Sequence, residues 1–244
     1  MLVLSLLVLS AFSVSACELT VRYERFSAYK PGGDIARWHG LDVDFAKALL
    51  DKAQCQFSFV ELPWGRAIGS LKAGLIDLVL SVSKTPEREP YYHFIGPQRT
   101  ETIVLAMNKA NIYPIEKLDD LLSLPLPVAV HRGAYYGEEF TQLLKKNANQ
   151  FITVVDNQTK LELLARNKIS GFLEEKGNLY YQQHFNPNFA HIHIDDFVVN
   201  SEDVYFAFSK RSLNEVQIRN IQQAFQSNEY QDQQSIILSK YGLE

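Results

Sequence analysis

The sequence predicts an α/β protein with two lobes, and two observations carry this prediction. Segments with the pattern of a strand alternate with segments with the pattern of a helix, which favours parallel sheets connected by crossover helices. The alternation stops in a loop-rich stretch, residues 108–127, which contains Pro114, Pro125 and Pro127, and then starts again. We therefore expect two α/β halves in one chain, with a cleft between them.

The first half contains four expected strands and two expected helices. Phe45, Leu49 and Leu50 lie on one side of the first helix, whereas residues 56–62 roughly alternate between apolar and polar side chains. Residues 76–82 form a nearly continuous apolar run, as in a strand that is covered on both faces. Gly74 ends the second helix. The strands are expected at residues 19–23, 56–62, 76–82 and 102–107, and the helices at residues 41–53 and 64–73.

The second half repeats this order and returns to the first. Strands are expected at residues 128–130, 151–155, 169–173, 191–194 and 204–208, and helices at residues 137–146, 160–167, 213–227 and 230–240. Ligands of open α/β sheets bind beyond the carboxyl ends of the strands. Three loops follow such ends, after Tyr23, Leu80 and Val130. They are the first places to look for a site.

Residues 1–16 have the pattern of a secretory signal peptide. Leu2 to Leu9 is an apolar run interrupted only by Ser5, and small residues follow it at 13–16. The run is too short to be a stable membrane anchor, and no Lys or Arg precedes it. We therefore predict an exported, periplasmic protein whose mature part begins at Cys17.

Cys17 and Cys55 are the two cysteines of the chain, and Cys17 has two interpretations. Val14-Ser-Ala-Cys17 resembles a lipobox, which would make Cys17 a lipid-anchored N-terminus. Both cysteines, however, stand just before an expected strand, and only Glu18 would separate a lipid anchor from the first strand. If those strands are parallel neighbours, the two sulfurs can meet, and an exported compartment permits the bond. We favour a disulfide between Cys17 and Cys55 over the lipid anchor.

Composition and motifs exclude several classes of partner. The 24 basic and 28 acidic side chains give a net charge of −4, and no basic cluster indicates nucleic acid. No later apolar run reaches membrane-spanning length, and neither a phosphate loop nor a Gly-x-Ser-x-Gly elbow is present. His191 and His193 share a strand face beside two aspartates, but an amphipathic strand explains them better than a metal site. No metal or cofactor is predicted.

Ser81-Val-Ser-Lys-Thr-Pro-Glu-Arg88 follows a buried strand and suits the capture of a small carboxylate. Ser81 and Ser83 offer hydroxyls and backbone N–H groups, and the planar fork of Arg88 pairs bidentately with a carboxylate. The alternative is a plain strand-to-helix loop, with Thr85 as N-cap and Arg88 in a surface ion pair.

The chain resembles the family-3 solute-binding proteins of polar amino-acid ABC importers. The resemblance runs through almost the whole mature chain, in the order Gly40-Leu-Asp-Val-Asp-Phe45, Pro63-Trp64, Gly74-Leu-Ile-Asp77, Thr85-Pro-Glu-Arg88, Val128-Ala-Val-His-Arg-Gly133 and Ile169-Ser-Gly-Phe-Leu-Glu-Glu175. It implies a two-lobed, type II periplasmic-binding-protein fold that grips its ligand in the cleft by hinge closure. The first lobe would comprise residues 17–99 and 200–244, and the second residues 100–199.

The resemblance also assigns roles to residues. Arg88 would bind the ligand α-carboxylate, with contacts from Ser81 and Ser83, and Trp64 would stack on the ligand. Glu24 and Phe26 lie in the first loop, where the family places an acidic or aromatic contact. Glu175 would hold the α-ammonium, with its neighbour Glu174 as the fallback. Each has a plain alternative: Trp64 as core, Glu24 as a solvated loop residue, and the two glutamates as the start of a helix.

The second-lobe loop departs from the family pattern. The family usually has a small hydroxyl residue after the loop glycine, whereas this chain reads Gly133-Ala-Tyr-Tyr136, preceded by His131 and Arg132. We include His131, Gly133 and Tyr135 among the ligand-binding residues. A bulkier, aromatic or non-amino-acid ligand is therefore an open alternative to an ordinary amino acid.

These observations together predict a monomeric, non-enzymatic binding protein. It would capture a small polar carboxylate, an amino acid or a relative of one, and deliver it to the membrane permease of an ABC importer. A periplasmic sensor subunit that presents its ligand to a membrane receptor is the first alternative. An enzyme of the prephenate or arogenate dehydratase type, with His131 or Glu175 as general acid, is the second.

Overall fold

A computed structural model describes residues 17–24, 28–29 and 39–243 of the chain. The predicted signal peptide and Phe26 lie outside these residues. Within them, no helix is long and apolar enough to cross a membrane.

One mixed sheet of eight strands runs through the described structure, in the order β4-β1-β5-β10-β6-β9-β7-β8. β1 pairs in parallel with β4 and β5, and β7 pairs in parallel with β8 and β9, whereas β10 and β6 are antiparallel to each other. The strands are β1 (Glu18–Tyr23), β4 (Gln56–Glu61), β5 (Leu78–Ser83), β6 (Tyr92–Asn108), β7 (Val128–His131), β8 (Phe151–Val154), β9 (Gly171–Glu175) and β10 (Ile192–Ser209). A separate pair joins β2 (Ala28–Tyr29) to β3 (His39–Gly40).

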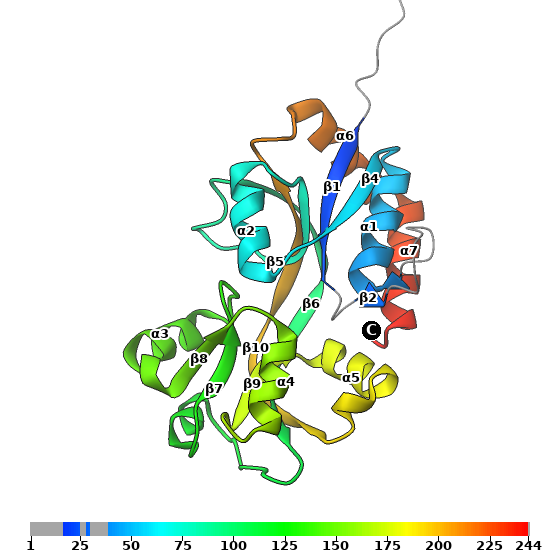
Figure 1. The fold of residues 1–244 in the computed structure, drawn as a ribbon. Coiled ribbons are helices and arrows are strands. Elements are labelled where there is room, and N and C mark those ends of the chain that lie inside the picture. Colours follow the sequence, from blue (N-terminus) through cyan, green and yellow to red (C-terminus); the bar gives the residue numbers. More distant parts are fainter. Residues whose placement is uncertain (1–16, 25–27, 30–38, 244) are drawn as a thin grey trace, which may run out of the picture.

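Helices cover the sheet in two bodies, which Figure 1 shows one above the other, connected by β6 and β10. We call the elements of the upper body the first lobe: β1, β4 and β5 with α1 (Leu41–Lys52), α2 (Trp64–Ala73), α6 (Glu215–Phe225) and α7 (Asn228–Lys240). The second lobe contains β7, β8 and β9 with α3 (Glu138–Lys146), α4 (Asn157–Ala165) and α5 (Lys176–Phe185). Short 3₁₀ helices lie at Leu118–Ser123, Ala148–Gln150 and Pro187–Phe189.

Each lobe has apolar cores on both faces of the sheet, which is why its strands read as nearly continuous apolar runs. In β6, Val104 and Ala106 face one core of the second lobe, whereas Leu105 and Met107 face the other. The main core of the first lobe packs α1, α6 and α7 against the sheet, and α2 covers the opposite face. Residues from the end of the chain, such as Phe206, belong to that main core.

β6 and β10 differ from the prediction because each is one long strand that crosses between the lobes. The sequence indicated separate strands, since the crossing segments are polar and lack apolar periodicity. The backbone ladder nevertheless continues there, with Thr102 opposite Ser201 and Glu101 opposite Glu202. The lobe boundaries predicted at 99/100 and 199/200 fall inside these two strands, and they stay a proposal.

The disulfide between Cys17 and Cys55 is confirmed. The two Cα atoms lie 4.6 Å apart, and the bond joins the starts of β1 and β4. The amide N of Gln56 donates to the carbonyl of Cys17, and Glu18 is in register with Gln56. The two strands are the parallel neighbours that the prediction required.

Candidate functional site

A cavity of about 140 Å³ lies where the two lobes meet. The carboxyl ends of β1, β5 and β7 all reach it, as expected for an α/β sheet. Seven of the predicted site residues line it: Glu24, Trp64, Ser81, Ser83, His131, Tyr135 and Glu175. The structure does not bring Arg88 or Gly133 to the lining, and Phe26 lies outside the described residues.

Gly133 connects the two lobes through its backbone carbonyl. The indole Nε1 of Trp64 and the Nη2 of Arg88 each donate to this oxygen over 3.1 Å. The Nη1 of Arg88 donates to the carbonyl of Ser83 over 2.9 Å, so the guanidinium binds one carbonyl from each lobe. Gly133 has a φ of +76°, a conformation that glycine adopts without strain. We call this arrangement the Gly133 clasp.

Ser81 and Arg99 meet on the first-lobe side of the cavity. Ser81 has a φ of +56°, which is rare for a residue with a side chain, and its amide N donates to Oε1 of Gln98. Its Oγ donates to Oδ1 of Asp42 over 3.0 Å and accepts from Nη2 of Arg99 over 3.4 Å. Strained backbone of this kind concentrates at functional sites.

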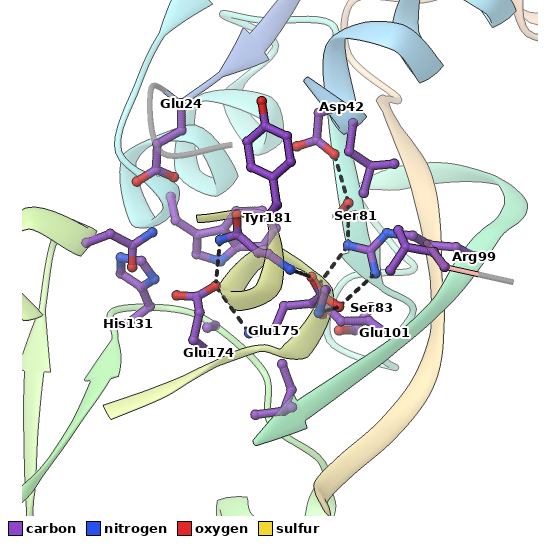
Figure 2. A pocket seen from close by; sticks show the side chains of 18 of the residues that line it. Glu24, Asp42, Ser81, Ser83, Arg99, Glu101, His131, Glu174, Glu175 and Tyr181 are labelled. Carbon is purple, nitrogen blue, oxygen red and sulfur yellow. Dashed lines mark hydrogen bonds and ion pairs between the residues drawn. The ribbon is translucent and has the colours of Figure 1, made fainter. Parts of the chain in front are cut away.

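Arg99 is a buried cation of the cavity wall, and no motif in the sequence predicts its role. It is 9% exposed, and its Nη2 lies 3.3 Å from Oε1 of Glu101 and its Nη1 3.7 Å from Oε1 of Glu175. Its Nε is buried without a hydrogen-bond partner among the described residues. Figure 2 shows Asp42, Ser81, Arg99, Glu101 and Glu175 gathered on one side of the cavity. Arg99 and Glu101 lie in the polar crossing segment of β6, where no motif marked them.

The two adjacent glutamates have different partners. Glu175 is the N-cap of α5: its Oε1 accepts from the amide N of Gly177 over 2.8 Å and its Oε2 from that of Asn178 over 2.5 Å. The Oε2 of Glu174 accepts from the buried Nζ of Lys160 over 2.8 Å. Burial opposes ionisation of Glu174, but Lys160 holds the pKa of this carboxyl below its ordinary value. Both carboxyl groups thus already accept hydrogen bonds from partners in the protein.

Glu24, His131 and Glu174 lie together on the other side of the cavity (Figure 2). Burial lowers the pKa of His131 to about 3, so its imidazole is neutral at ordinary pH. Its Nε2 and the Oδ1 of Asn157, which also lines the cavity, are buried without hydrogen-bond partners among the described residues. Unpaired buried polar atoms carry a free-energy cost that a ligand can relieve.

Arg22 lines the same side of the cavity and contacts both Glu24 and Trp64. Its guanidinium forms an ion pair with Glu24 and lies 5.3 Å from the centre of the Trp64 ring. Its Nε donates to the carbonyl of Leu62 over 3.1 Å. Burial raises the pKa of Glu24 even though Arg22 opposes the shift. The stacked guanidinium holds the indole at the cavity wall.

Carboxyl groups outnumber cations around the cavity. Among the described residues, five carboxyls and two guanidiniums line it: Glu24, Asp42, Glu101, Glu174 and Glu175, and Arg22 and Arg99. Lys160 adds a third cation behind Glu174. Burial raises the pKa of Glu101 to about 8, so this carboxyl is protonated at neutral pH. A cation that enters the cavity can therefore make the Glu101 carboxyl release its proton.

The family model for bacterial extracellular solute-binding proteins, family 3, matches residues 19–242, so the chain belongs to this family. The type II periplasmic-binding-protein fold predicted from the sequence is likewise confirmed. A curated relative is the arginine-binding extracellular protein ArtP of Bacillus subtilis (strain 168). It is 34% identical over 94 residues, which make up 38% of this chain and 35% of that protein. The chain thus matches about a third of the length of this relative.

Solved structures with the same fold include a binding protein and a sensor. An ancestral arginine-binding protein bound to arginine superposes with a TM-score of 0.76 at 20% identity, over 92% of this chain and 97% of that chain. A histidine kinase sensor domain with similarity to periplasmic binding proteins has a TM-score of 0.75 at 15% identity, over 93% of this chain and 96% of that chain. At these identities the likeness shows the fold alone.

Proposed function

We propose that this protein captures an amino acid with a positively charged side chain in the cavity between its lobes. It would then deliver the amino acid, outside the cytoplasm, to the permease of an ABC importer. Membership in the extracellular solute-binding family supports capture without catalysis. The charge of the cavity wall supports the ligand class.

The surplus of carboxyl groups is the observation that carries the proposal. Between the lobes, charges are poorly screened. The lining carboxyls outnumber the two guanidiniums and Lys160 even when the protonated Glu101 is left out, so the wall favours a ligand that brings positive charge. The unpartnered Oδ1 of Asn157 is a hydrogen-bond acceptor, and the unpartnered Nε2 of the neutral His131 is one in the tautomer that carries its proton on Nδ1. They suit a guanidinium or ammonium group, which donates several hydrogen bonds and accepts none.

The roles predicted for individual residues belong to this proposal. The buried, unpartnered Nε of Arg99 offers a donor to the ligand α-carboxylate, and Ser83 lines the cavity. Ser81 already donates through its amide N and its Oγ, so it would have to exchange a partner to bind the ligand. Arg88 would have to release the carbonyl of Gly133 before it reached that carboxylate. Trp64 forms an aromatic wall that a cationic or planar group can stack against.

Two observations support binding over the dehydratase alternative. His131 was one of the two candidate acids, but with a pKa of about 3 it carries no proton to donate at neutral pH. Glu175 was the other, and its two oxygens accept hydrogen bonds from the start of α5. Both oxygens of Glu175 are therefore already used as acceptors in capping the helix.

Calorimetric titration of the mature protein, residues 17–244, against a panel of free amino acids tests the ligand class. We expect L-arginine or L-lysine to bind and L-glutamate not to bind. At pH 7, binding of a cation should also release a proton from Glu101, so the measured enthalpy should depend on the ionisation enthalpy of the buffer. Tight binding of L-glutamate, or no binding of any basic amino acid to folded protein, would refute the proposed ligand class.

A matched pair of variants tests whether the preference for a cationic ligand comes from the cavity wall or from the overall charge of the protein. Glu24→Gln removes a carboxyl from the cavity wall, whereas Asp232→Asn removes one from the exposed surface of α7. We expect the first to weaken L-arginine binding by about tenfold, which corresponds to about 1.4 kcal/mol, and the second to leave it unchanged. Equal effects of the two changes would assign the preference to overall charge.

The identity of the membrane partner distinguishes a transport function from a sensing function. Loss of uptake of radiolabelled arginine on deletion of the gene, with permease and ATPase genes beside it, would support import. Normal uptake in the deletion strain, together with a neighbouring receptor gene, would support the sensor alternative instead.

A further inference from the structure

The segment after α7, residues 241–243, also reaches the ligand cavity. It does so at the side, and not on the two walls that the lobes present to each other. Tyr241 and Leu243 line the cavity together with Gly177 and Tyr181 of α5. α7 itself packs on α1 in the first lobe, and its end points toward α5 of the second lobe (Figure 1). No motif in the sequence marked these residues as part of a site.

Asp44 of α1 anchors the segment to the first lobe. The hydroxyl of Tyr241 donates to Oδ2 of Asp44 over 3.0 Å, and the Nζ of Lys240 donates to the same oxygen over 2.6 Å. A glycine turn then reverses the chain. Gly242 has a φ of +66°, and the amide N of Leu243 donates to the carbonyl of Leu238 over 3.0 Å, as in a Schellman motif.

The same segment contacts the second lobe at the start of α5. The rings of Tyr241 and Tyr181 lie 5.7 Å apart between their centres. The side chain of Leu243 lies against Gly177, and a Cβ at this position would collide with Cδ2 of Leu243. Leu243 therefore occupies the space that any side chain at position 177 would need.

Leu243 also borders a second hollow. That hollow is lined in part by Thr100, Lys176, Tyr180 and Asp203, and it shares Arg99, Glu175, Gly177 and Leu243 with the ligand cavity. A Schellman motif alone would require only the contact between Leu243 and Leu238. It accounts for neither the fit against Gly177 nor the contact of Leu243 with both hollows.

We infer that Tyr241 and Leu243 form a third wall of the ligand site, which closes the cavity at its side and limits the length of ligand that it admits. This inference rests on the proposed function only in taking the cavity as the ligand site. The wall is held by the first lobe and touches the second, so it is complete only when the lobes are together. It should slow the escape of the ligand and exclude longer ligands that would extend into the second hollow.

The contact itself is tested without ligand by hydrogen–deuterium exchange. Leu243→Ala should raise exchange in residues 176–181, and Leu243→Met, which keeps the bulk, should not. Gly177→Ala should raise exchange in residues 239–243, because its methyl group displaces Leu243. Gly69→Ala is the matched control, because a Cβ at this helical glycine meets nothing within 4 Å.

A double-mutant cycle tests whether the effects at positions 177 and 243 arise from the contact between these two residues. In the Leu243→Ala background the methyl group at position 177 no longer meets Leu243, so the effect of Gly177→Ala on exchange and on the melting temperature should be smaller than in the wild type. Independent, additive effects, or unchanged exchange at both segments, would overturn the inference whatever the ligand is.

Ligand size is tested with L-arginine and the dipeptide arginyl-glycine. We expect Leu243→Ala to speed dissociation of L-arginine by about tenfold and to bind the dipeptide better than the wild type does. Unchanged dissociation and unchanged exclusion of the dipeptide, with wild type that does bind arginine, would refute the third wall. If the wild type binds no amino acid, the proposed function fails, and the exchange experiment still decides whether the wall exists.

Discussion

Removal of the Cys17–Cys55 disulfide should cost the protein about 4 kcal/mol of stability. The two cysteines are 38 positions apart, and cross-linking a loop of that length restricts the unfolded chain by about this amount on the chain-entropy model. The bond also fixes β4, which is an edge strand and pairs only with β1 among the described strands. The change is Cys17→Ser with Cys55→Ser, and the assay is urea unfolding followed by circular dichroism.

Reduction of the wild type supplies the control, because it opens the bond without changing a residue. The reduced wild type and the double variant should lose the same free energy of unfolding. Affinity for the ligand should be unchanged, since neither cysteine lines the cavity. A loss below about 1 kcal/mol in both proteins would refute the reasoning, because it would mean that the loop is already ordered in the unfolded ensemble.

Three further changes probe the site. Glu101, with a pKa of about 8 when folded against 4.5 in the unfolded chain, makes unfolding release a proton, so stability should fall as pH rises from 4.5 to 8, and Glu101→Gln should remove that fall in melting curves. Arg88→Ala breaks the Gly133 clasp and should weaken ligand affinity by roughly 1–3 kcal/mol in titration calorimetry; unchanged affinity would also contradict its predicted ligand contact. Lys160→Met leaves Glu174 buried without its cation and should cost about 3–5 kcal/mol in urea unfolding, and a neutral result would show that Glu174 takes up a proton instead.

Local signals in the sequence were sufficient for most elements of the fold, but not for the crossing parts of β6 and β10. Gly74 ends α2 with a φ of +75°, as its position after an amphipathic segment predicted. The strand after it, β5, is buried almost throughout, as its apolar run predicted. The disulfide followed from the positions of Cys17 and Cys55 before two parallel strands. The helix end and the buried strand each depend on a few neighbouring residues, and the disulfide depends on two cysteines that each directly precede a strand.

The site was only partly predictable, because its charges come from distant parts of the chain. Arg99 and Glu101 lie in a polar stretch of β6 that no periodicity marks, and their importance follows from burial. Sequence could not distinguish the adjacent Glu174 and Glu175 either. β9 ends at Glu175 and α5 begins at the next residue, so the Glu175 carboxyl caps the helix. The carboxyl of Glu174 binds Lys160 instead.

The position of β10 in the centre of the sheet has a consequence for the order in which the chain can fold. β10 lies between β5 and β6, and the main core of the first lobe includes Phe206, Phe225 and Tyr230 from the last part of the chain. The cores of the second lobe are drawn from a continuous run, residues 103–199. A chain that emerges from its N-terminus can therefore complete the second lobe first, whereas the lobe that begins the sequence must wait for its end.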